Sequence, residues 1–296
     1  MKIAIIHTRP TPPWSARQLI LALESLGATA SYIRPDQILS EFGGLEKSSR
    51  VYHGSSPLDV SAVILRDIGF AITLEQFLRR FSAIKHLEIL GTPVVNPVES
   101  LVLARNKHLS LLLLSSRGIP VPRTAVTEDP YTAYRIAQSW GTIVIKPIVG
   151  SMGFGALKLD DPDVAFVVAR TLAQLGQPIY VQEYVEKPNR DIRAFVVGDR
   201  VVAAYYRVGD RSWKTNIAQG AKAVAIDRCP SEVEELAVRC CKILGLHYGG
   251  VDIAETENGY VVLEVNASPG WRGLVAATGI NPATHIARYV IELARR

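Results

Sequence analysis

The chain has 296 residues, of which 48% are hydrophobic, and its formal net charge is +5. A chain of this size and apolar content can bury its core in one large domain or in two to three smaller ones. The modest positive charge suits anionic small molecules such as nucleotides and carboxylates. Because aromatic residues are few and no basic block stands inside the chain, the composition argues against a nucleic-acid partner.

Cysteine usage and the amino-terminal residues bear on location. The three cysteines form neither a CxxC pair nor a zinc-like His/Cys spacing, and so sparse a set is typical of a reducing cytoplasm. The apolar run at residues 1–7 is too short for a signal peptide and indicates a first β-strand. No apolar run approaches the roughly 20 residues that a membrane span needs. We therefore expect a cytoplasmic protein without a membrane partner.

The first 97 residues alternate strand and helix patterns. The polar stretch 46–57 indicates a loop or a short hairpin. The periodicity predicts strands over residues 2–6, 61–66 and 92–96, and helices over residues 15–26 and 74–90, each ended by a glycine. Such alternation is typical of an open, mostly parallel α/β sheet.

A predicted helix over residues 100–117 ends at Gly118 and leads into a second α/β unit. That unit and the remainder of the chain give strands over 141–147, 155–159, 179–185, 191–197, 200–208, 251–256 and 260–266, and helices over 163–175, 231–244 and from about 281. The predicted fold class is therefore α/β, with an α+β C-terminal part. We predict domains over residues 1–97, 98–182 and 183–296.

The last predicted hairpin carries polar side chains inside apolar strands. Glu264 and Asn266 are two apart, so the period of a strand puts both on one face. A three-residue loop over 257–259 sets Asp252 across from Glu264, whereas a two-residue loop turns Asp252 to the other face; we predict the former. Carboxylate and amide oxygens are ligands of the kind that hold Mg²⁺. The alternative is a half-exposed hairpin whose acids face water.

A glycine-rich turn follows a buried strand that ends on Lys146. Its residues include Gly150, Ser151, Met152 and Gly153. Backbone N–H groups in such a turn can cradle phosphate oxygens, and a lysine at the end of the strand adds a positive charge for them. The chain has no Walker A motif and no GxGxxG. A plain hairpin turn remains the alternative.

Three further segments are candidates for ligand contact. Polar residues at the end of a buried strand could meet an adenine edge, or could be an ordinary strand end: Gln182, Glu183, Tyr184 and Val185. Asp191 and Arg193 share a strand face, and Arg207 lies on the next strand, which indicates a phosphate or carboxylate clamp or else a structural Asp–Arg pair. The polar stretch 212–221 is typical of a binding loop.

Taken in order, these motifs together with Lys107 resemble the ATP-grasp superfamily and, within it, the RimK-type glutamate ligases. By itself Lys107 would be read as a solvated charge on a helix. The resemblance covers essentially the whole chain and implies an ATP-grasp fold with an N-terminal Rossmann-like domain. It also implies an ATP-dependent carboxylate–amine ligase that forms an amide bond through an acyl-phosphate.

The resemblance also implies roles for individual residues. Those expected to bind ATP are Lys107, Lys146, Gly150, Ser151, Met152, Gly153, Gln182, Glu183, Tyr184, Val185, Asp191, Lys214 and Asn216. Asp252, Glu264 and Asn266 are expected to hold two Mg²⁺ ions, with Mn²⁺ as an alternative. Arg193 and Arg207 are the expected catalytic residues, which would stabilise the acyl-phosphate.

The second substrate is less defined. L-Glutamate is the expected amino acid, added to a small molecule or a peptide such as a ribosomal-protein tail. The residues around Lys146, the loop 212–216 and Trp271 look closest to the tetrahydromethanopterin ligases. The alternatives are a carrier-protein-dependent ligase of lysine or arginine biosynthesis and a small-molecule kinase on the same ATP site. We further expect a homo-oligomer, either a dimer or a tetramer.

Overall fold

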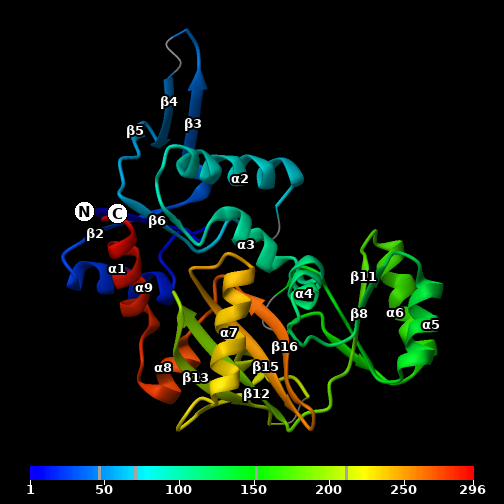
Figure 1. The fold of residues 1–296 in the computed structure, drawn as a ribbon. Helices are drawn as coiled ribbons and strands as arrows, with labels where there is room; N and C mark the ends of the chain where they lie inside the picture. The colour runs from blue at the N-terminus through cyan, green and yellow to red at the C-terminus, as the bar shows by residue number, and fades with distance from the viewer. Residues whose placement is uncertain (46–47, 70–71, 151–152, 211–212) are drawn as a thin grey trace.

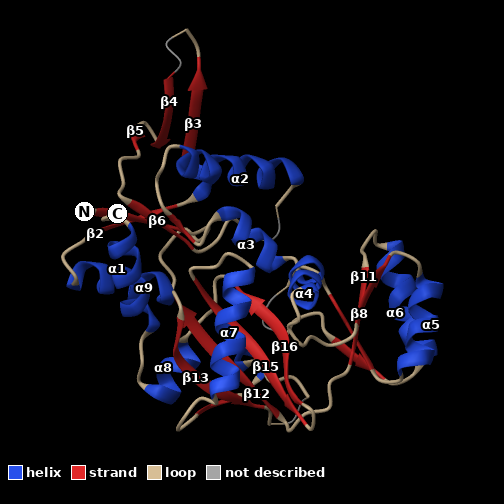
Figure 2. Ribbon diagram, viewed as in Figure 1, coloured by secondary structure: helices blue, strands red, loops and turns tan. Residues whose placement is uncertain are grey.

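The structure is a computed structural model that describes residues 1–45, 48–69, 72–150, 153–210 and 213–296 (Figure 1). Within these ranges the strands form four sheets, and helices cover their faces (Figure 2). No helix of the described residues is long and apolar enough to cross a membrane.

The N-terminal part is a parallel sheet in the order β2-β1-β6-β7, which confirms the predicted open parallel sheet. Its strands are β1 (Lys2–Ile6), β2 (Thr29–Ile33), β6 (Ala62–Leu65) and β7 (Val94–Val95). The helices α1 (Trp14–Ser25), α2 (Leu74–Ile89) and α9 (Pro282–Leu293) pack around it. The C-terminal helix thus returns to the N-terminal sheet, where it packs against α1 and β6 (Figure 1). Sequence periodicity missed β2, which is short and mostly half-exposed.

A hairpin extends from this sheet above α2 (Figure 1). It consists of β3 (Ile38–Gly43), β4 (Ser48–His53) and the short β5 (Ser56–Pro57), after the 3₁₀ turn Pro35–Gln37. The predicted loop or short hairpin over 46–57 therefore belongs to a longer hairpin that begins eight residues earlier. His86 of α2 contacts both long strands of this hairpin, since Ser40 and Ser49 lie 2.6 and 2.7 Å from the two ring nitrogens.

The single helix predicted over residues 100–117 is wrong. The chain forms α3 (Val98–Arg105) and α4 (Lys107–Ser116), which meet at Asn106. Asn106 has an extended backbone, and its side chain caps α4 by accepting a hydrogen bond from the N–H of Leu109. An asparagine that satisfies one of the unpaired N–H groups at a helix start stabilises a new helix there. This break sets Lys107 at the first residue of α4.

The second sheet is antiparallel, in the order β10-β9-β11-β8. Its strands are β8 (Thr124–Thr127), β9 (Ile143–Lys146), β10 (Leu157–Leu159) and β11 (Ile179–Glu183), and the helices α5 (Pro130–Trp140) and α6 (Pro162–Gln174) cover it. Small and branched side chains from both helices and from β9 and β11 form one buried core. The glycine-rich turn joins β9 to β10 at the end of this sheet.

The third sheet is antiparallel, in the order β14-β13-β12-β15-β16. Its strands are β12 (Arg190–Val197), β13 (Arg200–Val208), β14 (Lys222–Ala225), β15 (Tyr248–Thr256) and β16 (Gly259–Asn266). The helix α7 (Ser231–Ile243) crosses one face (Figure 2), and α8 (Arg272–Thr278) packs on β13 and β14. The short 3₁₀ turn Ile217–Gln219 precedes β14.

The β15–β16 hairpin reaches the predicted pairing of its acids by a different route. Thr256 pairs with Gly259, so the loop has two residues and the three-residue loop is wrong. Further along, Ile253 pairs with Val262 while Asp252 pairs with Glu264, which leaves Leu263 as an extra residue. This β-bulge shifts the register by one residue and returns Asp252 and Glu264 to one face.

Candidate functional site

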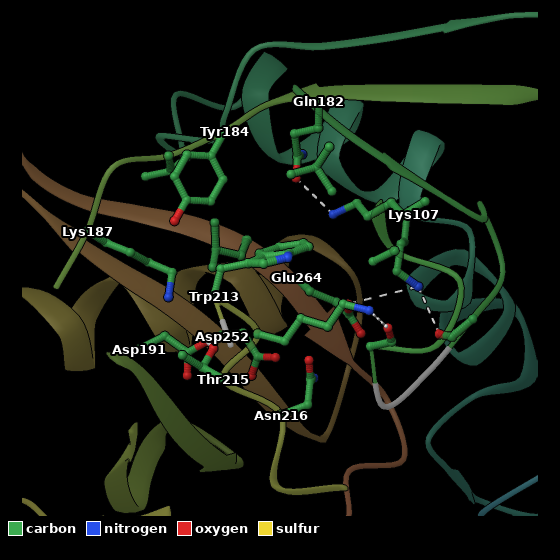
Figure 3. Close-up of a pocket in the computed structure, with 18 of the residues that line it drawn as sticks. Lys107, Gln182, Tyr184, Lys187, Asp191, Trp213, Thr215, Asn216, Asp252 and Glu264 are labelled. Carbon is green, nitrogen blue, oxygen red and sulfur yellow. Dashed lines mark hydrogen bonds and ion pairs between the residues drawn. The ribbon is translucent and has the colours of Figure 1, made fainter. Parts of the chain in front are cut away.

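A cleft lies between the second and third sheets, and predicted site residues from both sheets line it (Figure 3). Those present in its lining are Lys107, Lys146, Gly150, Gly153, Gln182, Glu183, Tyr184, Val185, Asp191, Arg207, Lys214, Asn216, Asp252 and Glu264. The predicted residues Arg193 and Asn266 are not part of this lining; they lie on β12 and β16. The predicted residues Ser151 and Met152 lie outside the described residues.

Lys107 is buried, with 7% of its surface exposed, so it is not the solvated charge that an isolated reading would give. Its Nζ donates a hydrogen bond to the carbonyl of Gly150 at 2.8 Å and lies 3.9 Å from Oε2 of Glu264 (Figure 3). The break at Asn106 turns this lysine inward. One ammonium group therefore touches both the glycine-rich turn and the carboxylate of the last hairpin.

Lys146 enters the same cleft from the end of β9. Its Nζ donates to Oε1 of Gln182 at 2.8 Å, and Nε2 of Gln182 donates to the hydroxyl of Thr124 at 3.0 Å. Burial lowers the pKa of Lys146 to about 8, and the nearby charge of Lys107 adds to the lowering while Glu264 opposes it. An enclosed ammonium without a carboxylate at contact distance among the described residues is suited to an incoming anion.

Two loops meet over the cleft at Gly153. Nζ of Lys214 donates to the carbonyl of Gly153 at 3.1 Å. The side chain of Asn216 lies against the α-carbon of Gly153, where a Cβ atom would come within 2.4 Å of its Oδ1. Gly153 also has a φ of +72°, which glycine adopts without strain. The glycine-rich turn and the 213–221 loop therefore close on each other over the cleft.

Aromatic rings form one wall near the end of β11. Tyr184 and Trp213 pack edge to face with their ring centroids 6.0 Å apart, and Nζ of Lys158 lies 3.8 Å from the Tyr184 ring centroid. Val144 and Val185 also line this part of the cleft. Flat apolar surfaces at the end of a strand provide surroundings that suit a planar heterocycle.

Asp252 is held by two arginines. Arg193 grips it with both Nε and Nη2, and Nη2 of Arg207 reaches its Oδ2 at 2.8 Å. The register explains this contact, because Arg193 stands directly opposite Asp252 on the paired strands β12 and β15. Burial alone would raise the pKa of Asp252, but Arg193 and Arg207 hold it below its usual range. The carboxylate is thus kept ionised inside the protein.

Asp191 extends this network. Nε and Nη2 of Arg207 donate to its two oxygens at 2.7 and 2.8 Å, and the hydroxyl of Thr215 donates to Oδ2. Burial by itself would lower the pKa of Arg207, yet Asp252 and Asp191 together raise it above its ordinary value. The predicted cluster of Asp191, Arg193 and Arg207 is therefore brought together, and it includes Asp252 as well.

The donor set at the end of the hairpin fits a magnesium ion. Glu264 has only Lys107 within ion-pair distance among the described residues, so its carboxylate is available to a cation. Each carboxylate oxygen has two lone pairs, so Asp252 can accept from arginine and still face a cation. The described ranges hold no group of three His, Cys, Asp or Glu residues suited to a metal. Magnesium needs no such cage, since one or two carboxylates and phosphate oxygens suffice.

The cleft also contains Lys187, which sequence reasoning did not select, and two residues of the predicted binding loop 212–221 that were not given individual roles. Lys187 points into it, and burial lowers the pKa of this lysine although Asp191 opposes the change (Figure 3). Thr215 is buried against Asp191, and Trp213 forms part of the wall. Lys187 follows the strand-end motif by two residues, and that spacing was the available signal for it.

Comparisons with known proteins identify the family of this chain. A family model described as a RimK-like ATP-grasp domain matches residues 104–290. The chain is 32% identical to the tetrahydromethanopterin:alpha-L-glutamate ligase of Methanosarcina acetivorans, over 98% of both proteins. It is 35% identical to the alpha-aminoadipate–LysW ligase LysX of Saccharolobus solfataricus, over 70% of this chain and 76% of that protein.

A solved structure is also similar over the whole length. The ATP-grasp ligase PsnB, in complex with a phosphomimetic variant of its minimal precursor, magnesium and ADP, has a TM-score of 0.78 and 24% sequence identity. The likeness covers 99% of this chain and 98% of that one. At this identity the likeness shows a shared fold.

Proposed function

The chain belongs to the RimK-like ATP-grasp family and is a ligase, and from this premise we propose that it uses ATP to join L-glutamate to a carboxylate-bearing acceptor. The ATP-grasp fold predicted from the sequence is confirmed by the same comparisons. The observation that carries the proposal is the convergence of Lys107, Lys146, Asp252 and Glu264 in one cleft under a glycine-rich turn. Two cations and two carboxylates placed so closely suit a metal-bound triphosphate.

We place the parts of the nucleotide according to the residues that line the cleft. The base would lie beside Tyr184 and Val185, against backbone groups at the end of β11. The phosphates would extend toward Lys146 and Lys107, with the turn that includes Gly150 and Gly153 above them. Asp191 has both oxygens engaged by Arg207 and Thr215, so its contribution would be to hold the arginine in place.

Magnesium would be held by Asp252, Glu264 and Asn266, and it would supply neutralisation of the charge on the phosphate oxygens. Arg207 and Arg193 flank these residues and would face the oxygens of the transferred phosphoryl group. Because both guanidinium groups are fixed by buried carboxylates, they need no rearrangement when charge develops. Lys214 and Asn216 would keep the glycine-rich turn closed and water out.

The reaction that fits this site has two steps. A carboxylate oxygen of one substrate attacks the γ-phosphorus of ATP, the bond to the β-phosphate oxygen breaks, and an acyl-phosphate and ADP form. The amine of the second substrate then attacks the acyl carbon, and phosphate leaves with one oxygen of the original carboxylate. Charge stabilisation and positioning carry such phosphoryl transfer, so no side-chain nucleophile is required.

The identity of the acceptor rests on the relatives. The Methanosarcina protein is named for glutamate and tetrahydromethanopterin, whereas LysX is named for alpha-aminoadipate and LysW. Similarity to the first covers nearly the whole chain, including the N-terminal sheet, which favours glutamate and a pterin-type small acceptor. A carrier-protein tail is the second possibility that the relatives support.

The test is ADP release with Mg²⁺-ATP and L-glutamate against a panel of acceptors: a tetrahydropterin with a carboxylate tail, a deazaflavin and a carrier-protein peptide. Mass spectrometry of the products decides the outcome. A gain of one or more glutamyl units on an acceptor supports the ligase and identifies its substrate. A phosphorylated product without an amide would indicate a small-molecule kinase instead.

A further inference from the structure

Arg66 is a buried cation without an acid partner. It follows β6 at the carboxyl edge of the N-terminal sheet, and only 5% of its surface is exposed. Its Nη1 donates to the hydroxyl of Tyr248 at 3.1 Å and its Nη2 to the carbonyl of Pro269 at 2.8 Å. Among the described residues no carboxylate lies within ion-pair distance of it, since the neighbouring Asp67 pairs with Arg105. A buried charge of this kind is costly unless something pairs with it.

The turn that follows the metal-ligand strand lies against this arginine. Residues 266–271 leave β16 and lead to Trp271, whose ring centroid is 4.8 Å from Cζ of Arg66. Trp271 is also buried, with 1% of its surface exposed. Asn266 and Ser268 on the same turn are half-buried. We call this group of four residues, Arg66, Asn266, Ser268 and Trp271, the donor corner.

Each member of the donor corner has a polar atom without a partner. Within the described part of the chain, the buried atoms lacking a hydrogen bond include Nε of Arg66, Nδ2 of Asn266, Oγ of Ser268 and Nε1 of Trp271. All four carry hydrogen, so what the corner lacks is an acceptor. Buried donors are almost always satisfied in folded proteins, and a concentration of exceptions requires an explanation.

The corner lies next to Gly250, which pairs with Asn266 and approaches Arg193. A Cβ built on Gly250 would lie 2.8 Å from the side chain of Pro269 and 3.1 Å from Nη1 of Arg193. Pro269 and Arg193, which grips Asp252, therefore both lie beside Gly250, and Asn266 belongs to the proposed magnesium set. A hydrogen-bond acceptor bound at the donor corner would therefore belong to a substrate that lies next to the reacting phosphate.

We propose that the donor corner binds a non-reacting carboxylate of the amino-acid substrate. The oxygens of a carboxylate would accept hydrogen bonds from the unpaired donors, and its negative charge would pair with Arg66. The inference rests on the proposed ligase function, because it assumes that an amino-acid substrate binds beside the γ-phosphate of ATP. It adds the N-terminal sheet to the substrate site through Arg66.

The experiment is calorimetric binding of L-glutamate to the full chain with Mg²⁺ and a non-hydrolysable ATP analogue. Trp271→Phe keeps the ring on Arg66 and removes the N–H, and Ser268→Ala removes the hydroxyl. Because a hydrogen bond to a charged group is lost, each is expected to weaken glutamate binding by about tenfold or more. Arg66→Met is expected to weaken it by more than either, since it also removes the charge.

The matched control is Trp14→Phe. Trp14 packs edge to face on Trp271 with centroids 6.2 Å apart, but it is not part of the donor corner. This variant should bind glutamate as the unaltered protein does. Affinity for the ATP analogue should be the same in all variants, which shows that each one is folded.

Analogues separate this inference from the proposed function. Glutamine and isoglutamine each replace one carboxylate by an amide. The analogue that lacks the carboxylate held by the donor corner should bind the unaltered protein much more weakly than glutamate does. In Trp271→Phe this difference in affinity should be smaller. Equal glutamate affinity in all variants would overturn the donor corner and leave the ligase intact. If glutamate does not bind, succinate, 2-aminoadipate and a C-terminal glutamyl peptide are tested in the same way.

If glutamate does not bind but another of these carboxylates does, weaker binding of that compound in Ser268→Ala and Trp271→Phe would support the donor corner. It would also remove glutamate from the proposed function. Failure of the whole panel to bind the unaltered protein would overturn the inference.

Discussion

Asp252 faces Glu264 across the β15–β16 hairpin because a single extra residue, Leu263, shifts the register between them. A regular two-residue hairpin would put the two carboxylates on opposite faces of the sheet. Bulges of this kind occur often beside active sites, where they redirect one side chain. The bulge therefore builds the acidic floor of the cleft.

The two acids should differ in their effect on stability. Asp252→Asn leaves Arg193 and Arg207 buried around a neutral group, and breaking such a buried pair costs about 3–5 kcal/mol. Glu264 has a single ion-pair contact, at 3.9 Å, so Glu264→Gln should change the free energy of unfolding by less than about 1 kcal/mol. Urea unfolding of the two variants measures the difference. Both should lose magnesium-dependent nucleotide binding, and equal unfolding free energies would contradict the described network.

Nucleotide affinity should fall as the pH rises above about 8, the pKa that burial gives to Lys146. The proton is lost from the free protein first, and bound phosphate favours the charged form, so binding weakens by about tenfold per pH unit above that pKa. Titration of an ATP analogue between pH 7 and 9.5 measures the slope. Lys146→Arg keeps its charge throughout and should flatten the slope. An equal slope in both proteins would assign the pH dependence to another group.

The same lowered pKa has a consequence for folding. Between pH 8 and the ordinary lysine pKa the unfolded chain binds the Lys146 proton more tightly than the folded chain does. Charged Lys146 therefore costs stability below about pH 8, and the cost decreases as the pH rises toward 10.5. Replacement by methionine should remove this contribution to the pH dependence of the unfolding free energy.

Asn106→Ala should weaken ATP binding through the position of Lys107. Loss of the cap at the start of α4 costs about 0.5–2 kcal/mol of stability and frees the first helical turn, which includes Lys107. Asp129→Ala provides the control, because Asp129 caps α5 by accepting from Tyr131 and Thr132 outside the cleft. Thermal unfolding should shift similarly in both variants, whereas the KM for ATP should rise only in Asn106→Ala. Unchanged KM values in both would disconnect the cap from the site.

Gly153→Ala should open the contact between the two loops over the cleft. The added methyl group would come 2.4 Å from Oδ1 of Asn216, and the φ of +72° strains any other residue. Gly176 has a φ of +65° with nothing within 4 Å of its Cβ position, so Gly176→Ala has the strain without the clash. We expect nucleotide affinity to fall by about tenfold only in Gly153→Ala, a loss of about 1.4 kcal/mol. Equal affinities would show that the loop contact is not used.

Sequence patterns identified the elements of this site better than their junctions. The apolar strands around Asp252 and Glu264 were evident from the residue order, because acids in apolar strands are rare. The bulge at Leu263 was not, since one extra residue changes the register without changing the apolar pattern. The helix break at Asn106 leaves no pattern either: apolar residues continue at helical spacing on both sides of it, and the cap depends on a side chain rather than on a glycine or proline.

Contacts between distant segments could not be predicted either. The pairing of Arg193 with Asp252 joins strands that are separated by α7, and nothing in the sequence sets that register. Residues 66–69 are expected either to line the acceptor side or to be a plain strand end, and nothing in the residue order places Arg66 beside Pro269 and Trp271. The division at residues 97 and 182 and the homo-oligomeric state stay predictions.

The most direct test of the central claim is transfer of an oxygen isotope from the acceptor to phosphate. The acceptor carboxylate is labelled with ¹⁸O, and the reaction is run with Mg²⁺-ATP and L-glutamate. We expect one ¹⁸O in each inorganic phosphate released, matched by one ADP and one new amide. Phosphate without ¹⁸O, or ¹⁸O retained on a phosphorylated product, would contradict a ligase that proceeds through an acyl-phosphate.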